Sequence, residues 1–251
     1  GLRNTDDPAT IPLIMPMIDA NFITPVGDKN TLWKLDANIL SLTRREGVDS
    51  LRLSLKNSLE LPYITPAGDV YHFYASLQTD AYHNSNYQNT SEFSGRIFPR
   101  IGLDWRLPLS RQTKFGTQVV EPVIGFQLAP NGGNSKKISN EDSQDIEFDE
   151  TNLFSRNRFT GLDRVDGGQR IYYGLKLGSI NPNISSDGFV GQSYSVGRNS
   201  DFAENSGLND HFSDIVGRLS LRPSDEIKIQ YRFRLDKDNF SARRSEFSTH
   251  A

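Results

Sequence analysis

The stretch "LRLSLKNSLEL", Leu51 to Leu61, decides the fold class of this chain. Its odd-numbered positions hold five leucines and one asparagine, whereas its even-numbered positions hold only polar or charged residues. Because successive side chains of a β-strand point to opposite faces, this period of two predicts a strand with one apolar and one polar face. The stretch "IKIQYRFRL", Ile227 to Leu235, has the same pattern and predicts a second such strand.

Less regular alternation recurs through the rest of the chain. It predicts strands near residues 33–39, 71–81, 100–107, 120–128, 170–177 and 214–222, and weaker ones near 11–24, near 189–196 and from about residue 240. A helical period of 3.6 and a repeat of fixed spacing are both absent from the sequence. The expected fold is therefore all-β, with about ten or eleven strands.

Strand length and connection length distinguish a membrane barrel from a soluble sandwich. Soluble strands average about five or six residues, whereas a tilted membrane strand needs about nine to eleven. The gaps near 25–30, 62–69, 108–116, 181–187 and 223–226 are short, and alternate gaps near 84–95, 129–168 and 198–212 are long, although those near 44–50 and 236–239 are short too. Short periplasmic turns that alternate with long extracellular loops are typical of an outer-membrane barrel. The sequence thus predicts a segment of an antiparallel transmembrane β-barrel, in which Pro99 and Pro122 are expected at edges or bulges.

Composition excludes several other classes of protein. The 251 residues are 35% hydrophobic and 24% charged, with a net charge of -3, so the basic footprint of a nucleic-acid-binding protein is missing. No run of eighteen apolar residues is present, which excludes a transmembrane helix. The chain has no cysteine, and therefore no disulfide or thiolate chemistry. Both ends are expected to be cuts through a longer protein.

Two features were considered for catalysis or metal binding. His72 and Ser76 lie two steps apart on one predicted strand face, a spacing that also arises often by chance. The acidic run from Glu141 to Glu150 holds six carboxylates but lacks the spacing and central glycine of a calcium-binding loop. A polar strand face and a solvated loop are the simpler interpretations. We therefore expect no catalytic residue, no metal site and no cofactor, and the protein is not expected to be an enzyme.

A set of basic residues projects from the predicted polar strand faces. If the apolar faces meet lipid, these charges line a wet lumen, where guanidinium groups suit phosphate and carboxylate groups. Pairing with acidic residues across the lumen would account for most of them. The candidate lumen-facing charges are Arg52, Lys56, Arg100, Arg106, Arg170, Lys176, Arg218, Arg222, Lys228, Arg232 and Arg234.

Five stretches resemble the barrel domain of the LptD family of lipopolysaccharide-assembly outer-membrane proteins, also known as the organic solvent tolerance or OstA family. The most specific are "VVEPVIGFQLAP" (Val119 to Pro130), "DETNLFSRNRFTGLDRVDGGQRIYYGLKLG" (Asp149 to Gly178) and "VGQSYSV" (Val190 to Val196). The stretches "IFPRIGLDWRLPL" (Ile97 to Leu109) and "DANILSLTRREGVDSLRLSLKNSLELPYITPAG" (Asp36 to Gly68) are similar to alphaproteobacterial members. The resemblance runs over nearly the whole chain in the same order.

The resemblance implies that residues 1–251 are an interior segment of the C-terminal β-barrel domain. That barrel has roughly 26 strands, and its gate strands and the N-terminal jelly-roll domain would lie outside this chain. The implied function is insertion of lipopolysaccharide into the outer leaflet of the outer membrane of a Gram-negative cell, without bond chemistry. The implied partners are lipopolysaccharide, outer-membrane lipid, an LptE-type plug lipoprotein and, through the absent N-terminal domain, an LptA-type periplasmic bridge.

The longest connection carries an apolar cluster of its own, which a solvated loop would not need. We expect its apolar residues to fold the loop inward over the lumen and three of its charged residues, Arg158, Asp163 and Arg164, to anchor it to inward charges or to the plug. The candidate inward-folded loop consists of Leu153, Phe154, Arg158, Phe159, Gly161, Leu162, Asp163 and Arg164.

Two alternative functions are compatible with the same strand pattern. A general outer-membrane porin would conduct small solutes rather than export lipid. A barrel lipase would require His72 to act as a base.

Overall fold

The computed structural model describes residues 9–27, 30–86, 91–114, 116–144, 147–181, 184–197, 201–224 and 226–250. These residues form strands, turns and loops, and none of them belongs to a helix long and apolar enough to cross a membrane. The prediction of an all-β fold is confirmed.

The described residues form twelve strands. They are β1 (Leu13–Val26), β2 (Thr31–Thr43), β3 (Val48–Ile64), β4 (Val70–Asn86), β5 (Ser91–Arg106), β6 (Leu109–Thr113), β7 (Gly116–Leu128), β8 (Gln169–Ile180), β9 (Ser185–Ser195), β10 (Ile215–Arg222), β11 (Lys228–Leu235) and β12 (Ala242–His250).

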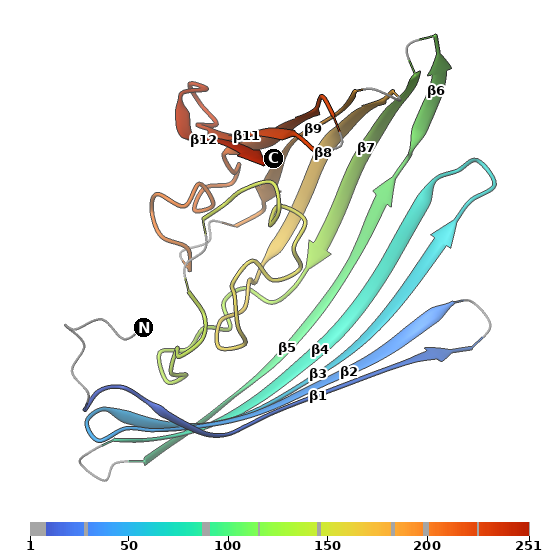
Figure 1. The fold of residues 1–251 in the computed structure, drawn as a ribbon. Helices are drawn as coiled ribbons and strands as arrows, with labels where there is room; N and C mark the ends of the chain where they lie inside the picture. The colour runs from blue at the N-terminus through green and yellow to red at the C-terminus, as the bar shows by residue number, and fades with distance from the viewer. Residues whose placement is uncertain are drawn as a thin grey trace.

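All strand pairs are antiparallel, and the strands follow one another in chain order across a single sheet (Figure 1). β5 and β6 both pair with β7, at its two ends, so the twelve strands occupy eleven positions. Within the described residues the sheet does not close. The carbonyl of Pro122 in β7 accepts a hydrogen bond from Leu107, in the break between β5 and β6. The missing N–H of Pro122 therefore faces this break, where the neighbouring ladder is already interrupted. Pro99 lies in the part of β5 that pairs with β4 alone, beyond the end of β7.

Two predicted connections are wrong. The long connection expected near 84–95 is mostly strand, because β4 continues to Asn86 and β5 begins at Ser91. The short gap expected near 108–116 contains β6. Gly95 and Pro99 interrupt the alternation in the first half of β5, which explains why the sequence pattern did not predict strand there.

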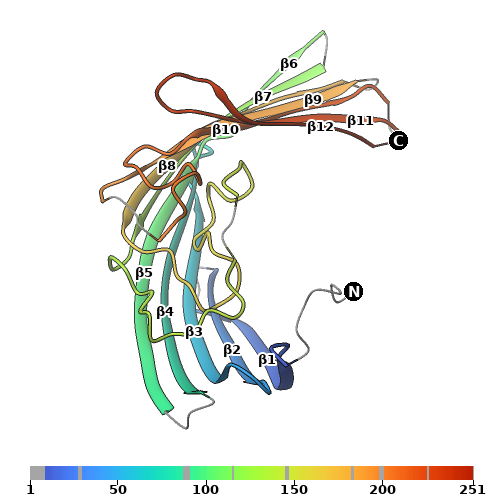
Figure 2. The same cartoon turned by 90° about the vertical axis from the view of Figure 1, so that its left-hand side faces the viewer.

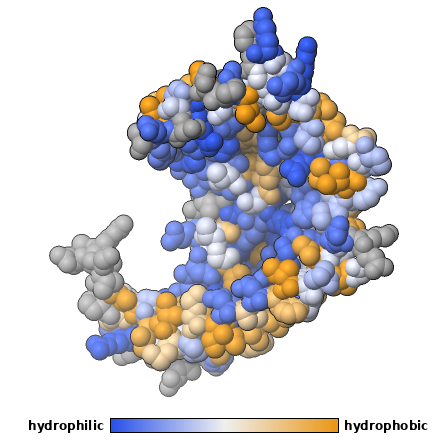
Figure 3. All heavy atoms as spheres, turned by 45° about the vertical axis from the view of Figure 1, so that its right-hand side comes forward, coloured by the Kyte–Doolittle hydropathy of each residue, from blue (hydrophilic) through white to orange (hydrophobic). Residues whose placement is uncertain are grey.

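The sheet exposes its apolar face and buries its charged face, which is the reverse of the arrangement in a soluble protein. Along β3, Leu51, Leu53 and Leu59 are 47%, 42% and 47% exposed, whereas Arg52 between them is 4% exposed. Leucine at this exposure on so many strands is unusual for a water-soluble protein, in which a large apolar patch marks an interaction surface. We refer to the leucine-bearing side as the outer face and to the side that carries Arg52 as the inner face. Figure 3 shows hydrophobic residues gathered on the outer surface of the first strands and mainly hydrophilic residues in the hollow.

The sheet curves around its inner face, and the connection between β7 and β8 lies inside the curve (Figure 2). We call this connection, residues 129–168, the inner loop. The connection between β9 and β10, whose described part includes residues 201–214, is the second loop. Both loops extend from the same end of the sheet, as the predicted barrel layout requires.

Tyrosine rings on the inner face lie over glycines of neighbouring strands. Tyr74 covers Gly102, its partner on β5, and Tyr172 covers Gly125, its partner on β7. A side chain at either glycine would occupy the space of the ring, so glycine permits the aromatic side chain to lie flat on the sheet.

Candidate functional site

The inner loop has a hydrophobic core of its own that is shared with the sheet. Phe148 and Leu153 are fully buried and Phe159 is 4% exposed. Their cluster contains residues of the inner face (Tyr172, Phe189 and Val216) and of the second loop (Phe202 and Leu208). Phe148, Leu153 and Phe159 are thus buried against strands β8 to β10, which stabilises the loop over the inner face.

Arg52 of β3 binds two carboxylates of the inner loop, those of Asp142 and Asp163. One of its terminal nitrogens lies 2.6 Å from Asp142 Oδ2 and 2.7 Å from Asp163 Oδ1. Asp163 also accepts hydrogen bonds from the Tyr82 hydroxyl and from the backbone N–H groups of Glu141 and Asp142. A buried arginine that pairs with two loop carboxylates fixes the position of the loop relative to β3 and β4.

Arg96 of β5 binds the inner loop through its backbone. Its guanidinium lies 2.5 Å from Asp80 of β4 and donates to the carbonyl groups of Leu162 and Asp163, at 2.7 and 2.8 Å. This residue is absent from the sequence-based prediction because the predicted strand begins only near residue 100, whereas β5 begins at Ser91. Its position two residues before Phe98 and four before Arg100, on the same strand face, is the signal that could have found it.

Asp166 is the centre of a buried charge cluster between the inner loop and β8. It is fully buried and lies 2.6 Å from Arg158 Nε, and Arg170 of β8 also pairs with it. Arg100 of β5 donates to the Asp166 backbone carbonyl at 3.3 Å. Burial opposes ionisation of Asp166, but Arg158 and Arg170 outweigh it and hold the pKa of this carboxyl below its usual range.

The strand register puts all eleven candidate lumen-facing charges on the inner face. Four of them contact the inner loop: Arg52, Arg100, Arg170 and Arg232, the last through Glu150 at 3.2 Å. Arg234 lies 3.5 Å from Asp214 of the second loop. The remaining six lie elsewhere on this face. Arg106 and Lys176 lie beside Glu121, and Arg218 lies beside Asp187. Lys56 is half-buried between β2 and β4, and Arg222 and Lys228 lie near the end of the sheet opposite the two loops.

The other predicted residues of the inner loop have different surroundings. Phe154 packs against the hydrophobic cluster with its ring nearly perpendicular to that of Tyr172, at an interplanar angle of 79°. Arg164 lies over the Phe159 ring and donates to the Asp201 carbonyl of the second loop. Leu162 is only half-buried and Gly161 is exposed, so they contribute backbone rather than apolar contact.

His72 and the acidic run from Glu141 to Glu150 both lie in ion-pair networks. His72 Nδ1 lies 3.3 Å from an Arg156 nitrogen and 3.6 Å from Asp104, and its Nε2 lies 3.6 Å from Glu60. In the acidic run, Glu141 pairs with Arg44, Asp142 with Arg52 and Glu150 with Arg232; residues 145 and 146 lie outside the described residues. Among the residues described, no three acidic or histidine side chains converge in a way that could hold a metal ion.

Comparison with known proteins agrees with this geometry. The family model for LptD, "LPS transport system D", matches residues 1–251. The chain belongs to the LptD family. It is 30% identical over 184 residues to an LPS-assembly protein LptD of Pseudomonas savastanoi pv. phaseolicola, an alignment that covers 68% of this chain and 19% of that protein.

Other LptD proteins match at similar levels. That of Pseudomonas syringae pv. tomato is 29% identical over 226 residues, which cover 82% of this chain and 23% of the relative. That of an Escherichia coli strain is 25% identical over 172 residues, which cover 64% and 22%. This LptD chain therefore spans about a fifth of the length of the curated relatives it matches. Its curved, antiparallel, open sheet is a partial β-barrel, and its location is the outer membrane.

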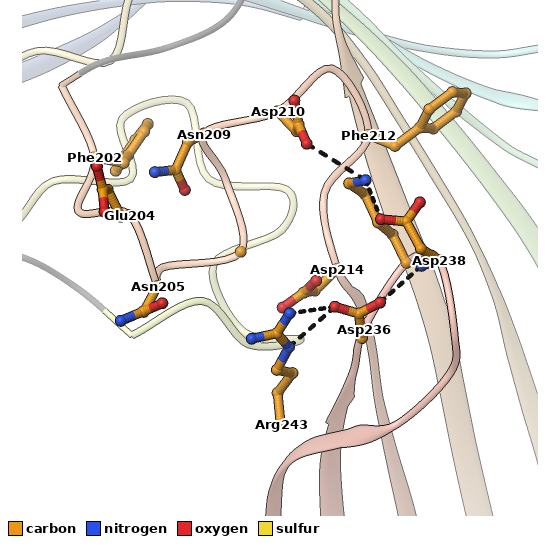
Figure 4. Close-up of a pocket in the computed structure, with 12 residues that line it drawn as sticks. Phe202, Glu204, Asn205, Asn209, Asp210, Phe212, Asp214, Asp236, Asp238 and Arg243 are labelled. Atoms are coloured by element: carbon orange, nitrogen blue, oxygen red, sulfur yellow. Dashed lines mark hydrogen bonds and ion pairs between the residues drawn. The ribbon is translucent and has the colours of Figure 1, made fainter.

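This LptD chain has a further cavity of about 630 Å³ beside the second loop (Figure 4). Phe202, Glu204, Asn205 and Asn209 of the second loop lie on one side of it. The turn between β11 and β12, residues 236–241, lies on the other side with Arg243. Arg243 pairs with Asp236, whose carboxylate also accepts the backbone N–H groups of Asp238 and Asn239. Together these contacts define one wall of the cavity.

The Asp236 turn gives a pH prediction. The Arg243 guanidinium and the two backbone N–H groups lower the pKa of Asp236 to about 2, below the ordinary value of about 3.9. A depressed pKa in the folded state means that the contribution of Asp236 to stability is present above about pH 4 and is lost as the pH falls toward 2. Hydrogen exchange at the Asp238 and Asn239 amides should therefore be equally protected at pH 5 and pH 7 and less protected at pH 2.5.

The same turn contains its own control. The Ser241 amide donates to the side-chain oxygen of Asn239, which does not titrate, and its protection should change less. Asp236→Asn should remove the pH dependence at Asp238 and Asn239. Unchanged protection of these two amides in the parent chain at pH 2.5 would contradict the assignment.

Proposed function

We propose that this chain forms part of the wall of a translocon that inserts lipopolysaccharide into the outer leaflet of the outer membrane. The observation that carries the proposal is a sheet with an exposed apolar outer face and a charged inner face covered by its own loop. Its match to the LptD model over its full length supports the same function. The function is transport and requires no bond chemistry from this chain.

The open edges of the sheet support a larger assembly. β1 and β12 each pair on one side alone within the described residues, and unpaired backbone groups are costly in hydrocarbon. We propose that residues 1–251 are an interior part of the C-terminal barrel domain and that further strands complete the wall. A jelly-roll domain, an LptA-type bridge that docks on it and an LptE-type plug in the lumen complete the proposed assembly.

The inner face suits this role because its guanidinium groups are numerous and largely fixed. We propose that the lumen-facing charges Arg222 and Lys228, which lie near the end of the sheet opposite the two loops, meet the anionic parts of the passing lipid. Arg52, Arg96 and Arg170, in contrast, hold the inner loop in place.

Depletion of the full-length protein tests the proposal in the organism that carries this chain. Newly made lipopolysaccharide should stop arriving at the cell surface and should return when the parental gene is restored. Arrival at the parental rate after depletion would refute the proposed function.

A planar-bilayer measurement separates the translocon from a porin. With the inner loop fixed over the inner face, the full-length protein should pass little steady ion current. A large, stable conductance would favour a general diffusion channel instead.

A further inference from the structure

The cavity beside the second loop continues into a second one. This second cavity, of about 580 Å³, is lined by Gln192, Tyr194 and His211 as well as by four residues of the first: Asp210, Phe212, Lys237 and Asp238. The two cavities therefore meet at these four residues. Tyr194 pairs with Ile171, which is exposed on the outer face, so the second cavity opens at the loop end of that face.

The charged groups around the cavities already pair with one another. Lys237 lies 3.4 Å from Asp210 and 2.5 Å from Asp238, and Arg243 pairs with Asp236 (Figure 4). Five carboxylates and two cationic side chains line the first cavity, so its net charge is negative. A phosphate or carboxylate ligand would meet repulsion here and would have to break existing ion pairs.

A divalent cation also fits poorly. In the part of the chain that the structure describes, acidic and histidine side chains do not converge in groups of three or more at metal-binding geometry. The carboxylates instead point to Lys237, Arg234 and Arg243. The ligand that these cavities suit is therefore neither an anion nor a metal ion.

The remaining groups combine hydrogen bonding with flat apolar surface. The side chains of Glu204 and Asn205 are exposed on the second-loop side of the cavity. Tyr194 stacks with His211, at a ring centroid distance of 6.1 Å, and lies 4.8 Å from the Phe212 ring, which is 48% exposed. A sugar ring has a rim of hydroxyl groups and two apolar C–H faces. Amide and carboxylate groups match the rim, and aromatic rings match the faces.

We propose that the two joined cavities form a binding site for a neutral oligosaccharide, contacted by Phe212 and Tyr194 through ring faces and by Asn205 and Glu204 through hydrogen bonds. The volume is ample, because ligand sites typically measure about 300 to 1,000 Å³. The source that fits best is the sugar portion of lipopolysaccharide, since the second cavity opens on the outer face, where a lipid-anchored saccharide arrives. That choice of source rests on the proposed function.

Binding of lipid-free oligosaccharide to the full-length protein in detergent tests the site. The probe is a neutral oligosaccharide, free of phosphate groups and acidic sugars, prepared from the lipopolysaccharide of the same organism, and its binding is measured by saturation-transfer NMR and calorimetry. Phe212→Ala and Asn205→Ala should each weaken binding about tenfold, the loss expected for one ring or one hydrogen-bonding group. Both side chains are exposed, so their truncation should leave folding unchanged.

Phe240→Ala is the matched control. Phe240, in the turn between β11 and β12 beside the first cavity, is 63% exposed and lines neither cavity. The Phe240→Ala variant should bind the probe as tightly as the parent protein does. Absence of probe binding, or equal binding by the parent and both site variants, would overturn the proposal.

Two further arms identify the ligand and its source. Tighter binding of inorganic phosphate or Ca²⁺ than of the oligosaccharide would overturn the saccharide assignment. Binding of exopolysaccharide fragments alone would overturn lipopolysaccharide as the source. The depletion experiment above is independent of this assay: loss of export without probe binding removes only the present inference, whereas probe binding with unaffected export removes only the proposed function.

Discussion

Asp166→Asn is expected to release the inner loop from the inner face. The substitution keeps the shape of the side chain but removes the charge that Arg158 and Arg170 share in a fully buried position. Removing one partner of a buried ion pair typically costs about 3–5 kcal/mol, because the remaining charge is left uncompensated. Here two guanidinium groups lose their carboxylate together.

Trypsin cleavage of the loop on intact cells and in proteoliposomes measures this release. A cost of this size raises the population of the open loop by about two to nearly four orders of magnitude. Cleavage after Arg156, Arg158 or Arg164 should be slow in the parent and rapid in the variant.

Glu147→Gln is the control for the loop experiment. Glu147 is an exposed carboxylate of the same loop and pairs with Arg244 at 2.9 Å on the surface, where such a pair contributes about 0–1 kcal/mol. Trypsin should cleave the inner loop of the Glu147→Gln variant at the same rate as that of the parent. If Asp166→Asn were cleaved no faster than Glu147→Gln, the charge cluster would not hold the loop.

Gly125→Ala is expected to prevent correct assembly of the sheet. A Cβ atom at this position would overlap the ring of Tyr172 and lie 2.6 Å from Asp104 Oδ1. The ring cannot move aside easily, because Tyr172 is 1% exposed and its hydroxyl donates to Asp104 at 2.5 Å. Overpacking typically costs about 1–3 kcal/mol and more where the neighbours are fixed. The fraction of full-length protein that is folded in the outer membrane, measured by heat-modifiable mobility, should fall severalfold.

Gly178→Ala provides the comparison within the same sheet. Gly178 is an inner-face glycine of β8, and a Cβ atom there would lie 3.6 Å from Val119 Cβ, an ordinary contact. This variant should assemble normally. In a Tyr172→Ala background, Gly125→Ala should cost less than in the parent, since the ring it overlaps is gone and Asp104 is no longer held by the Tyr172 hydroxyl. If Gly125→Ala and Gly178→Ala assembled equally well, packing of the Tyr172 ring would not require the absence of a side chain at residue 125.

Alternation in the sequence was sufficient to predict the strands whose two faces differ most. Leu51 to Leu61 predicted both the position of β3 and the face that remains exposed, because the side-chain period of a strand is fixed at two. The predicted apolar cluster of the inner loop was informative for a similar reason. A large apolar side chain such as Leu153 in a connection has to be buried somewhere.

Pairings that depend on the path of a loop could not be predicted in the same way. The contacts of Arg96 with Leu162 and Asp163 join residues more than sixty positions apart, and no local pattern encodes that distance. The sequence also gave no indication that Asp166 would be the partner of Arg158 and Arg170. Which buried arginine meets which carboxylate depends on how the loop crosses the sheet.

The central claim is that the leucines of β3 contact hydrocarbon while the alternate side chains face the protein interior. Single cysteines can be placed from residue 51 to residue 59, a region that has no cysteine of its own, in the full-length protein, labelled with a nitroxide and reconstituted in lipid bilayers, with the unsubstituted full-length protein as the labelling control. Accessibility to oxygen, which concentrates in hydrocarbon, should be high at 51, 53, 55 and 59 and low at 52, 54, 56 and 58. Low oxygen accessibility at the leucine positions, or the absence of a period of two, would contradict the account.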